Sequence, residues 1–221
     1  MDFERCLFTR RSVRKFDNKP LDDKIIESII TAGIYAPSAC NFQAWKFIVV
    51  RDEKKKKILK NYILDNAPVC IIVVYRNDLY VTGRKHYDYI QSAAAAIENM
   101  LLYAHSIGIG GCWLCHYPKQ EKIRSDFHIP DNFDIIGLVA LGFPKEGSEN
   151  TKEQMEYHYG SEMAFKEHKR RFTLEQVICN ENFSILEGDC TTVLYPKKMS
   201  VLKNTVKYYW KKFFDRGGGK K

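Results

Sequence analysis

The sequence has no apolar run approaching the roughly 18 residues that a membrane-spanning helix requires, so a transmembrane segment is not expected. Residues 1–5 are not followed by the apolar segment of a secretion signal, and we therefore expect no export. The seven cysteines are odd in number and scattered, which is not the pattern of a disulfide framework. We expect reduced thiols and a cytoplasmic protein.

The excess of positive charge is confined to the end of the chain. The 221 residues carry a net charge of +8, and residues 191–221 contain nine Lys or Arg side chains against one acidic residue, Asp215. Subtracting that segment from the 35 basic and 27 acidic residues leaves 26 of each in residues 1–190. The body is therefore neutral, and its charge does not indicate nucleic-acid binding. We expect a core domain over residues 1–190 and a separate basic segment over residues 191–221.

Helical and extended patterns alternate along the body without an internal repeat. Isoleucines recur at helical spacing in residues 22–35, and residues 87–107 include four consecutive alanines that allow close packing. Patterns of these two kinds predict helices over 22–35, 52–66, 87–107 and 119–127, and strands over 45–50, 69–75, 110–114 and 135–141. With 45% hydrophobic residues, the chain can bury one substantial core. We expect one layered α/β domain.

Three arginines and a serine occur within five positions, in the segment Arg10-Arg11-Ser12-Val13-Arg14. Guanidinium is a planar, permanently charged group whose donors match phosphate oxygens in pairs, and a serine hydroxyl adds a neutral hydrogen bond. The segment therefore suggests a phosphate site. Taken alone, it is more typical of a basic surface turn, because arginine clusters are common at protein surfaces.

A second polar segment, residues 36–45, connects the first predicted helix to the first predicted strand. It contains Pro37 and Ser38 and two side-chain amides, Asn41 and Gln43. An amide and several backbone N–H groups in such a loop could face a flat polar heterocycle. Without other information, it is an ordinary loop.

The order and spacing of these two segments resemble the FMN-dependent nitroreductase family, in which an Arg-Arg-Ser-x-Arg segment precedes a Pro-Ser-x-x-Asn-x-Gln-x-Trp segment. Further segments extend the resemblance: the central helix pattern 87–104, the glycine-rich 108–113, the Gly-Phe-Pro turn in 140–146 and the basic 169–177. The similarity covers residues 3–183.

The resemblance implies an α/β (α+β) nitroreductase-like fold, with a central mixed, mainly antiparallel sheet flanked by helices, in a dimer that exchanges terminal segments. It implies FMN at the homodimer interface and a ping-pong cycle, in which NAD(P)H reduces FMN and is replaced by a small acceptor such as a nitroaromatic or a quinone. The flavin N5 carries the chemistry, so no catalytic residue is assigned. Two alternatives stay open: a dehalogenase or biosynthetic oxidase on the same scaffold, and a membrane-docked flavin-binding protein with little turnover.

The resemblance also implies which residues of this sequence contact the cofactor. The phosphate and the ribityl chain would be held by Arg10, Arg11, Ser12, Arg14 and either Arg171 or, one position earlier, Arg170. The ring would lie beside Pro37, Ser38 and Ala39 of the partner subunit, together with Asn41. Backbone donors, apolar cover and space for close approach would come from Trp113, Leu114 and Gly142.

The segment Cys112-Trp113-Leu114-Cys115-His116 matches the c-type haem attachment pattern and contains a Cys-x-x-Cys pair. A haem would require export and a different helical domain, and zinc would require a second ligand pair that does not follow at short spacing. A functional disulfide is a third interpretation, and ordinary packing is the one we favour. The six histidines are dispersed, so we expect no metal site and no catalytic histidine.

The resemblance does not explain residues 191–221. Their apolar side chains from Met199 to Phe213 fall on one helical stripe, and the lysines lie off it. Such a helix can pack on the protein's own dimer, which we favour, or lie at the anionic inner face of a membrane. A nucleic acid or another protein is the least favoured partner, and we expect no nucleic acid.

Overall fold

The computed structural model describes residues 1–59, 67–79, 87–115 and 120–145. All of them belong to residues 1–149, the first of two units into which the chain divides. The second unit, residues 150–221, lies outside the described residues, so the domain boundary expected at residue 190 and the C-terminal helix stay predictions. In chain order the elements are α1 (Phe3–Thr9), α2 (Asp23–Ile34), the 3-10 turn η1 (Ala39–Asn41), β1 (Trp45–Val50), α3 (Glu53–Ile58), β2 (Val69–Arg76), α4 (Asp88–Ser106), β3 (Gly110–Leu114), α5 (Gln120–Asp126) and β4 (Phe133–Gly142).

Three of the helices begin at an aspartate. The carboxylates of Asp2, Asp22 and Asp52 accept hydrogen bonds from backbone N–H groups in the first turns of α1, α2 and α3, at 2.8, 2.8 and 2.9 Å. An N-cap of this kind satisfies a donor that the helix itself leaves unpaired, and it is worth about 1 kcal/mol. The starts of these helices are therefore encoded locally.

The strands form one sheet in the order β1-β2-β4-β3, and each of its ladders is antiparallel. A single parallel bridge joins Ser12 to Gly111 of β3. The expected mainly antiparallel sheet flanked by helices is thus confirmed. Strand β2 is central, and its residues Val69 to Tyr75 are all buried because helices cover both faces of the sheet.

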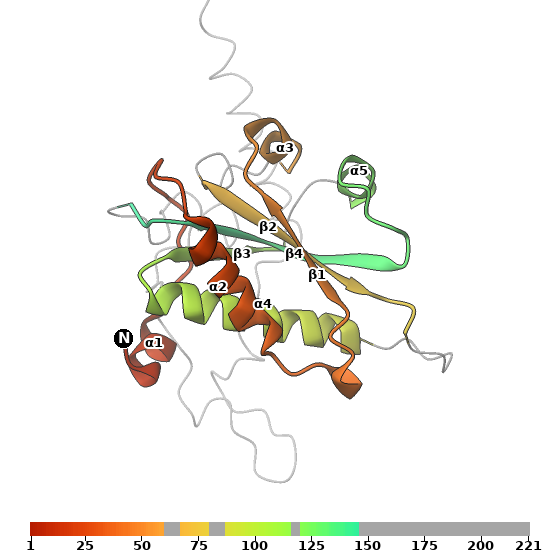
Figure 1. Cartoon of the computed structure of the whole chain (residues 1–221), viewed down its shortest axis with the longest axis horizontal. Helices are drawn as coiled ribbons and strands as arrows, with labels where there is room; N and C mark the ends of the chain where they lie inside the picture. The colour runs from red at the N-terminus through yellow and green to blue at the C-terminus, as the bar shows by residue number, and fades with distance from the viewer. Residues whose placement is uncertain (60–66, 80–86, 116–119, 146–221) are drawn as a thin grey trace, which may run out of the picture. The chain divides into compact units, whose positions relative to one another are not determined.

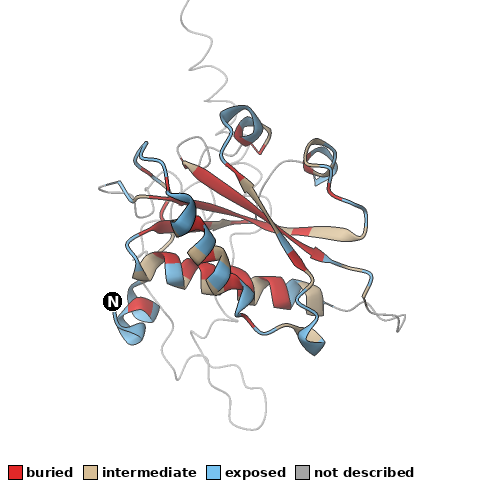
Figure 2. Cartoon of the chain, in the orientation of Figure 1, coloured by how far each residue is buried: buried red, intermediate tan, exposed pale blue. Residues whose placement is uncertain are grey.

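Alternate residues of β2 pack into two separate cores. Ile71 and Val73 pack with α2 and α4 on one face, whereas Cys70 and Ile72 pack with side chains of the α3 and α5 regions on the other. Figure 1 shows these two helical layers, and Figure 2 shows that the buried residues concentrate in the sheet and along α4. Helices α2 and α4 cross closely: a Cβ added at Gly33 would lie 2.8 Å from Met100 Cγ.

Most predicted elements agree with the structure to within two residues at each end. Helix α3 is an exception, because it ends at Ile58 rather than continuing to Asn66, and residues 60–66 lie outside the described residues. The sequence reading also missed α1, whose seven residues are too few for a clear helical period. The buried face of α4 includes Ala93, Ala96 and Met100, whereas Ile90 is 37% exposed.

Candidate functional site

The arginine segment, residues 10–17, runs from the end of α1 across the ends of β3 and β4. The Val13 N–H donates to the Gly111 carbonyl at 3.0 Å, beside the parallel bridge between Ser12 and Gly111. Farther along, the Asp17 N–H donates to the Phe143 carbonyl at 3.0 Å. Backbone pairing with β3 and with the residue that follows β4 thus positions the segment that the sequence singled out.

The glycines at the start of β3 make this close approach sterically feasible. A Cβ at Gly110 would lie 2.8 Å from Val13 Cβ, and one at Gly111 would lie 2.6 Å from Leu101 Cδ2 on α4. A larger residue at Gly110 would displace Val13 of the arginine segment, and one at Gly111 would force the Leu101 side chain to shift. The glycine-rich segment therefore serves chain packing here, whatever else it contacts.

The three arginines make different contacts. Arg10 Nε lies 3.4 Å from Glu98 Oε1 on α4. Arg11 folds back, and its Nη1 donates to the Phe8 carbonyl at 3.1 Å and to the Arg10 carbonyl at 2.7 Å, so it satisfies acceptors at the end of α1. Arg14 lies near the thiol of Cys112 on β3, close enough for its charge to act on that group.

Arg10, Ser12 and Arg14 belong to the segment that pairs with the start of β3 through Ser12 and Val13. Burial raises the pKa of the Cys112 thiol, and the positive charges of Arg14 and Arg10, with a hydrogen bond from Ser12, oppose that rise. Backbone pairing of Ser12 and Val13 with Gly111 holds this segment, with its arginines and its serine hydroxyl, along β3. These residue types suit a phosphate.

The amide loop, residues 36–45, is held by side-chain hydrogen bonds. The Ala39 N–H donates to Ser92 Oγ on α4 at 3.1 Å, and the Gln43 N–H donates to Ser38 Oγ at 3.1 Å. The Gln43 side-chain amide donates to Asn41 Oδ1 at 3.0 Å. These contacts orient the exposed Asn41 amide, which is one of the predicted ring contacts.

The same loop contains three residues in the left-handed backbone region: Cys40, Asn41 and Gln43, with φ of 51°, 54° and 47°. Asparagine tolerates this conformation, but cysteine and glutamine adopt it at a cost of order 1 kcal/mol or more each. Strained backbone of this kind concentrates at functional sites and is maintained by surrounding contacts. The loop geometry is consistent with a binding role.

Both segments lie beside α4. Arg10 contacts Glu98, and Ala39 contacts Ser92, which is six residues nearer the start of the helix. Six helical residues correspond to about 9 Å along the axis. The arginine segment and the amide loop are thus both supported by α4, at two points along the helix.

A family model described as the nitroreductase family matches residues 7–62 and 55–143, which is more than half of the chain. The chain belongs to the nitroreductase family. A protein of Archaeoglobus fulgidus, provisionally named an NADH dehydrogenase/NAD(P)H nitroreductase, is 40% identical over 155 residues, covering 65% of this chain and 87% of that protein. A similarly named protein of Methanothermobacter thermautotrophicus is 34% identical, covering 66% and 79%.

Solved nitroreductase structures agree with this assignment. A family protein from Clostridium novyi is 29% identical, with a TM-score of 0.61 over 68% of this chain and 89% of that one. A nitroreductase from Bacteroides fragilis with bound FMN is 27% identical, with a TM-score of 0.55 over 68% and 92%. The family and the nitroreductase-like fold that the sequence predicted are confirmed.

The remaining predicted ring contacts are largely engaged by their own chain. The half-buried Trp113 indole lies against Gly137, where a Cβ would collide with Nε1. The Leu114 side chain is buried in the core on the α3 and α5 side of the sheet. The backbone of Leu114 is therefore the part that could contact a cofactor. A Cβ at Gly142 would lie 2.6 Å from Pro68 Cδ, so chain packing alone requires a glycine there.

The two cysteines of the Cys-x-x-Cys pair are free thiols. Cys112 is buried and Cys115 is exposed, and desolvation raises the pKa of both. A protonated thiol is a poor nucleophile and a poor metal ligand. Across the described ranges no group of His, Cys, Asp or Glu side chains could hold a metal ion, and His116 lies outside them.

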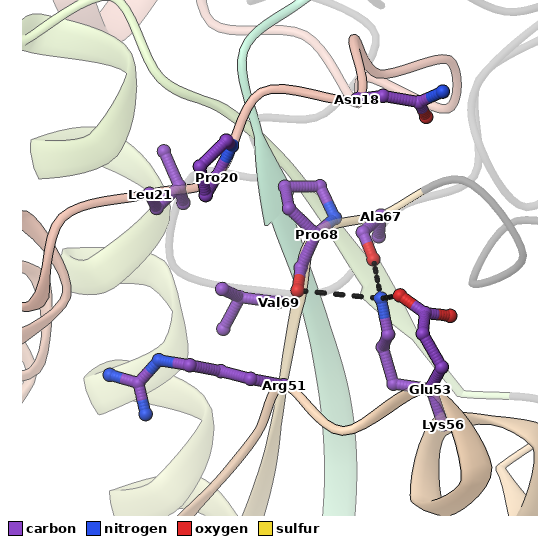
Figure 3. Close-up of a pocket in the computed structure, with 9 residues that line it drawn as sticks. All are labelled: Asn18, Pro20, Leu21, Arg51, Glu53, Lys56, Ala67, Pro68 and Val69. Atoms are coloured by element: carbon purple, nitrogen blue, oxygen red, sulfur yellow. Dashed lines mark hydrogen bonds and ion pairs between the residues drawn. The ribbon is translucent and has the colours of Figure 1, made fainter.

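A pocket of about 490 Å³ opens between the loop before α2 and the start of β2, and Figure 3 shows its lining. Of the predicted FMN contacts that lie within the described residues, none lines it. Lys56 is buried at its edge, and its ammonium donates to the Ala67 and Pro68 carbonyls at 2.8 and 3.4 Å and pairs with Glu53 at 2.6 Å. These three partners use the three donors of Lys56, so this lysine, which the sequence reading missed, ties α3 to the start of β2.

The predicted late phosphate arginines, Arg170 and Arg171, lie outside the described residues, and their role stays a prediction. In the part of the chain that the structure covers, no helix combines the length and apolar character needed to cross a bilayer.

Proposed function

We propose that this protein is an FMN-dependent oxidoreductase that uses NAD(P)H, in a ping-pong cycle, to reduce a small acceptor such as a nitroaromatic or a quinone. The observation that carries the proposal is the backbone pairing of the arginine segment with Gly111 of β3, in a chain of the nitroreductase family. The names of its relatives as NAD(P)H nitroreductases, and the bound FMN of the Bacteroides fragilis protein, support the same chemistry.

The residues present fit the phosphate of FMN. A phosphate dianion needs compensating charge and several donors, which two guanidinium groups and a hydroxyl provide. Since residues 1–190 carry equal numbers of basic and acidic side chains, these arginines form a local positive site within a neutral body. Arg11 would support the site from its position at the end of α1, and Arg171 or Arg170 would add a late cation.

The amide loop would contact the flavin ring. In this proposal Pro37, Ser38 and Ala39 of the partner subunit lie beside the ring, and Asn41 hydrogen-bonds its polar edge. Trp113 and Leu114 add backbone donors, and Gly142 leaves room nearby. Bound FMN would supply the hydride and electron transfer, so the chain needs no nucleophile of its own and must bind, orient and exclude water.

A homodimer is part of the proposal, because FMN would lie between two copies of the chain. Large apolar side chains are exposed on α1 and at the end of α2: Phe3 is 74%, Phe8 66% and Tyr35 82% exposed. These side chains are available for contact with a second copy of the chain. Sedimentation of the flavin-bound protein should give the mass of a dimer, and a flavin-bound monomer would overturn this part.

A visible absorption spectrum of the purified protein tests the core of the proposal. Two flavin bands that bleach on addition of NADH or NADPH and return on addition of a quinone or nitroaromatic are expected. Parallel lines in double-reciprocal plots would support the ping-pong order. A haem Soret band, or a colourless protein that FMN cannot reconstitute, would overturn the proposal.

Peripheral contact with an anionic membrane rests on the sequence of residues 191–221 alone. Co-sedimentation with vesicles of anionic phospholipid compares the full chain with a chain that ends after Cys190. If the tail docks on the surface, only the full chain sediments with the vesicles, and equal recovery in solution would reject the contact.

A further inference from the structure

Helix α1 packs against α4 through side chains near its end. Thr9 Oγ1 lies 3.0 Å from His105 Nε2, and Arg10, the C-cap of α1, lies 3.4 Å from Glu98. Glu98 and His105 are seven residues apart, so they lie on the same side of α4. The ion pair therefore belongs to the contact that fixes where α1 ends and the arginine segment begins.

The geometry of the ion pair leaves most of the guanidinium for another partner. Glu98 Oε1 approaches Arg10 at Nε, which carries one of the five N–H donors. The four donors on the terminal nitrogens form the fork that matches phosphate oxygens. The Arg10 side chain is 21% exposed and that of Glu98 is 45% exposed. The pair is therefore partly open to solvent, and a ligand can reach the arginine.

The backbone around Arg10 is anchored to α1 and to the strand beside the candidate phosphate site. Two residues later, Ser12 bridges to Gly111, and the Val13 N–H pairs with the Gly111 carbonyl at 3.0 Å. The backbone on both sides of Arg10 is thus anchored, by α1 before it and by β3 after it. The remaining freedom is that of the side chain itself, and Glu98 is the group that restricts it.

We propose that Glu98 is a positioning residue, which holds the guanidinium of Arg10 so that its terminal nitrogens face the FMN phosphate. This inference rests on the proposed function. A free arginine side chain samples many rotamers, and restricting it before binding lowers the entropic cost of forming the complex. Glu98 does not contact the phosphate, because two anions repel each other.

Titration of the full-length, flavin-free protein with FMN and with riboflavin tests the role of Glu98. Riboflavin has the same ring and ribityl chain but lacks the phosphate. In Glu98→Ala, FMN affinity should fall about tenfold, and riboflavin affinity should change less than about twofold. Glu98→Gln keeps the length of the side chain and one oxygen that can accept from Arg10, so the ratio of FMN to riboflavin affinity should return to the wild-type value or exceed it.

Two further variants separate positioning from general effects. In an Arg10→Ala background, Glu98→Ala should cause no additional change in the FMN to riboflavin ratio, since the group being positioned is absent. Asp126→Asn is the matched control, because it also removes one carboxylate from an ion pair, that with Lys122 at 2.9 Å on α5. This control should leave the ratio unchanged.

The outcomes are distinct. A wild-type protein that binds no FMN overturns the proposed function and this inference with it. If the wild type binds FMN but Glu98→Ala keeps the wild-type ratio, or binds FMN more tightly, only the positioning role is overturned. Equal losses in Glu98→Gln and Glu98→Ala would also reject it, since the retained oxygen would then have no effect.

Discussion

The arginine segment and the amide loop both lie beside α4, but they are held in different ways. Backbone pairing of Val13 with Gly111 and of Asp17 with Phe143 fastens the arginine segment to β3 and to the residue that follows β4. The amide loop instead depends on side-chain hydrogen bonds, of which that from Ala39 to Ser92 reaches α4. The first segment therefore inherits the rigidity of the sheet, whereas the second depends on a few local contacts and a strained backbone.

The largest effect on cofactor affinity is expected in the arginine segment. Arg14→Ala should weaken FMN binding by about 1.5–3 kcal/mol, because one charge-assisted contact is lost, and should leave riboflavin binding unchanged. Arg11→Ala should instead lower the free energy of unfolding by about 1 kcal/mol, because Arg11 satisfies carbonyls at the end of α1. Fluorescence titration and urea unfolding measure the two quantities. FMN binding at wild-type affinity in Arg14→Ala would refute the phosphate assignment.

A change in β3 should move the arginine segment without altering any arginine. In Gly110→Ala the new Cβ meets Val13 at 2.8 Å, so we expect a loss of about 1–3 kcal/mol in the free energy of unfolding and weaker FMN binding. Gly108→Ala is the control, because its φ of 80° imposes strain of about 1 kcal/mol while no atom lies within 4 Å of its Cβ. If both variants bind FMN equally well, the pairing with β3 does not position the site.

A substitution that loosens the amide loop should weaken binding less, and it should affect FMN and riboflavin equally. Ser92→Ala removes the acceptor of the Ala39 N–H, and FMN and riboflavin should both lose about 1 kcal/mol of binding free energy. Ser106→Ala on the same helix is the control, because its hydroxyl bonds only to the Tyr103 carbonyl, at 2.7 Å. A loss confined to FMN would show that the loop acts on the phosphate and would break the comparison.

The smallest effect concerns pH and the thiol beneath the arginine segment. Because burial raises the folded-state pKa of Cys112 above its ordinary 9.0, the stability it contributes is fully present below pH 9 and is lost as the pH rises through the folded pKa. We therefore measure the free energy of unfolding in urea at several pH values above 9. It should fall less steeply with rising pH in Cys112→Ala than in the exposed-thiol control Cys40→Ala. Identical alkaline profiles would argue against a buried neutral thiol at this position.

Local patterns in the sequence anticipated much of the fold but little of the side-chain geometry in the site. The isoleucine spacing of α2 and the apolar run of β2 record which faces are buried, so these elements and their limits could be predicted. Helix α1 could not, because seven residues hold barely two turns and its contact with α4 is made by residues about 90 positions later. The same distance in sequence concealed the Arg10–Glu98 pair.

The sequence by itself determined the family, the order of the elements and the residue types available at the site, because helical and strand periods and the spacing of motifs are local properties of a chain. Only the tertiary structure decided what each of these residues contacts. Arg10, Arg11 and Arg14 are neighbours with the same side chain, yet one pairs with α4, one closes α1 and one lies beside β3. Their roles differ because the packing of α1, α4 and β3 around them, and not their own chemistry, sets the partner that each guanidinium can reach.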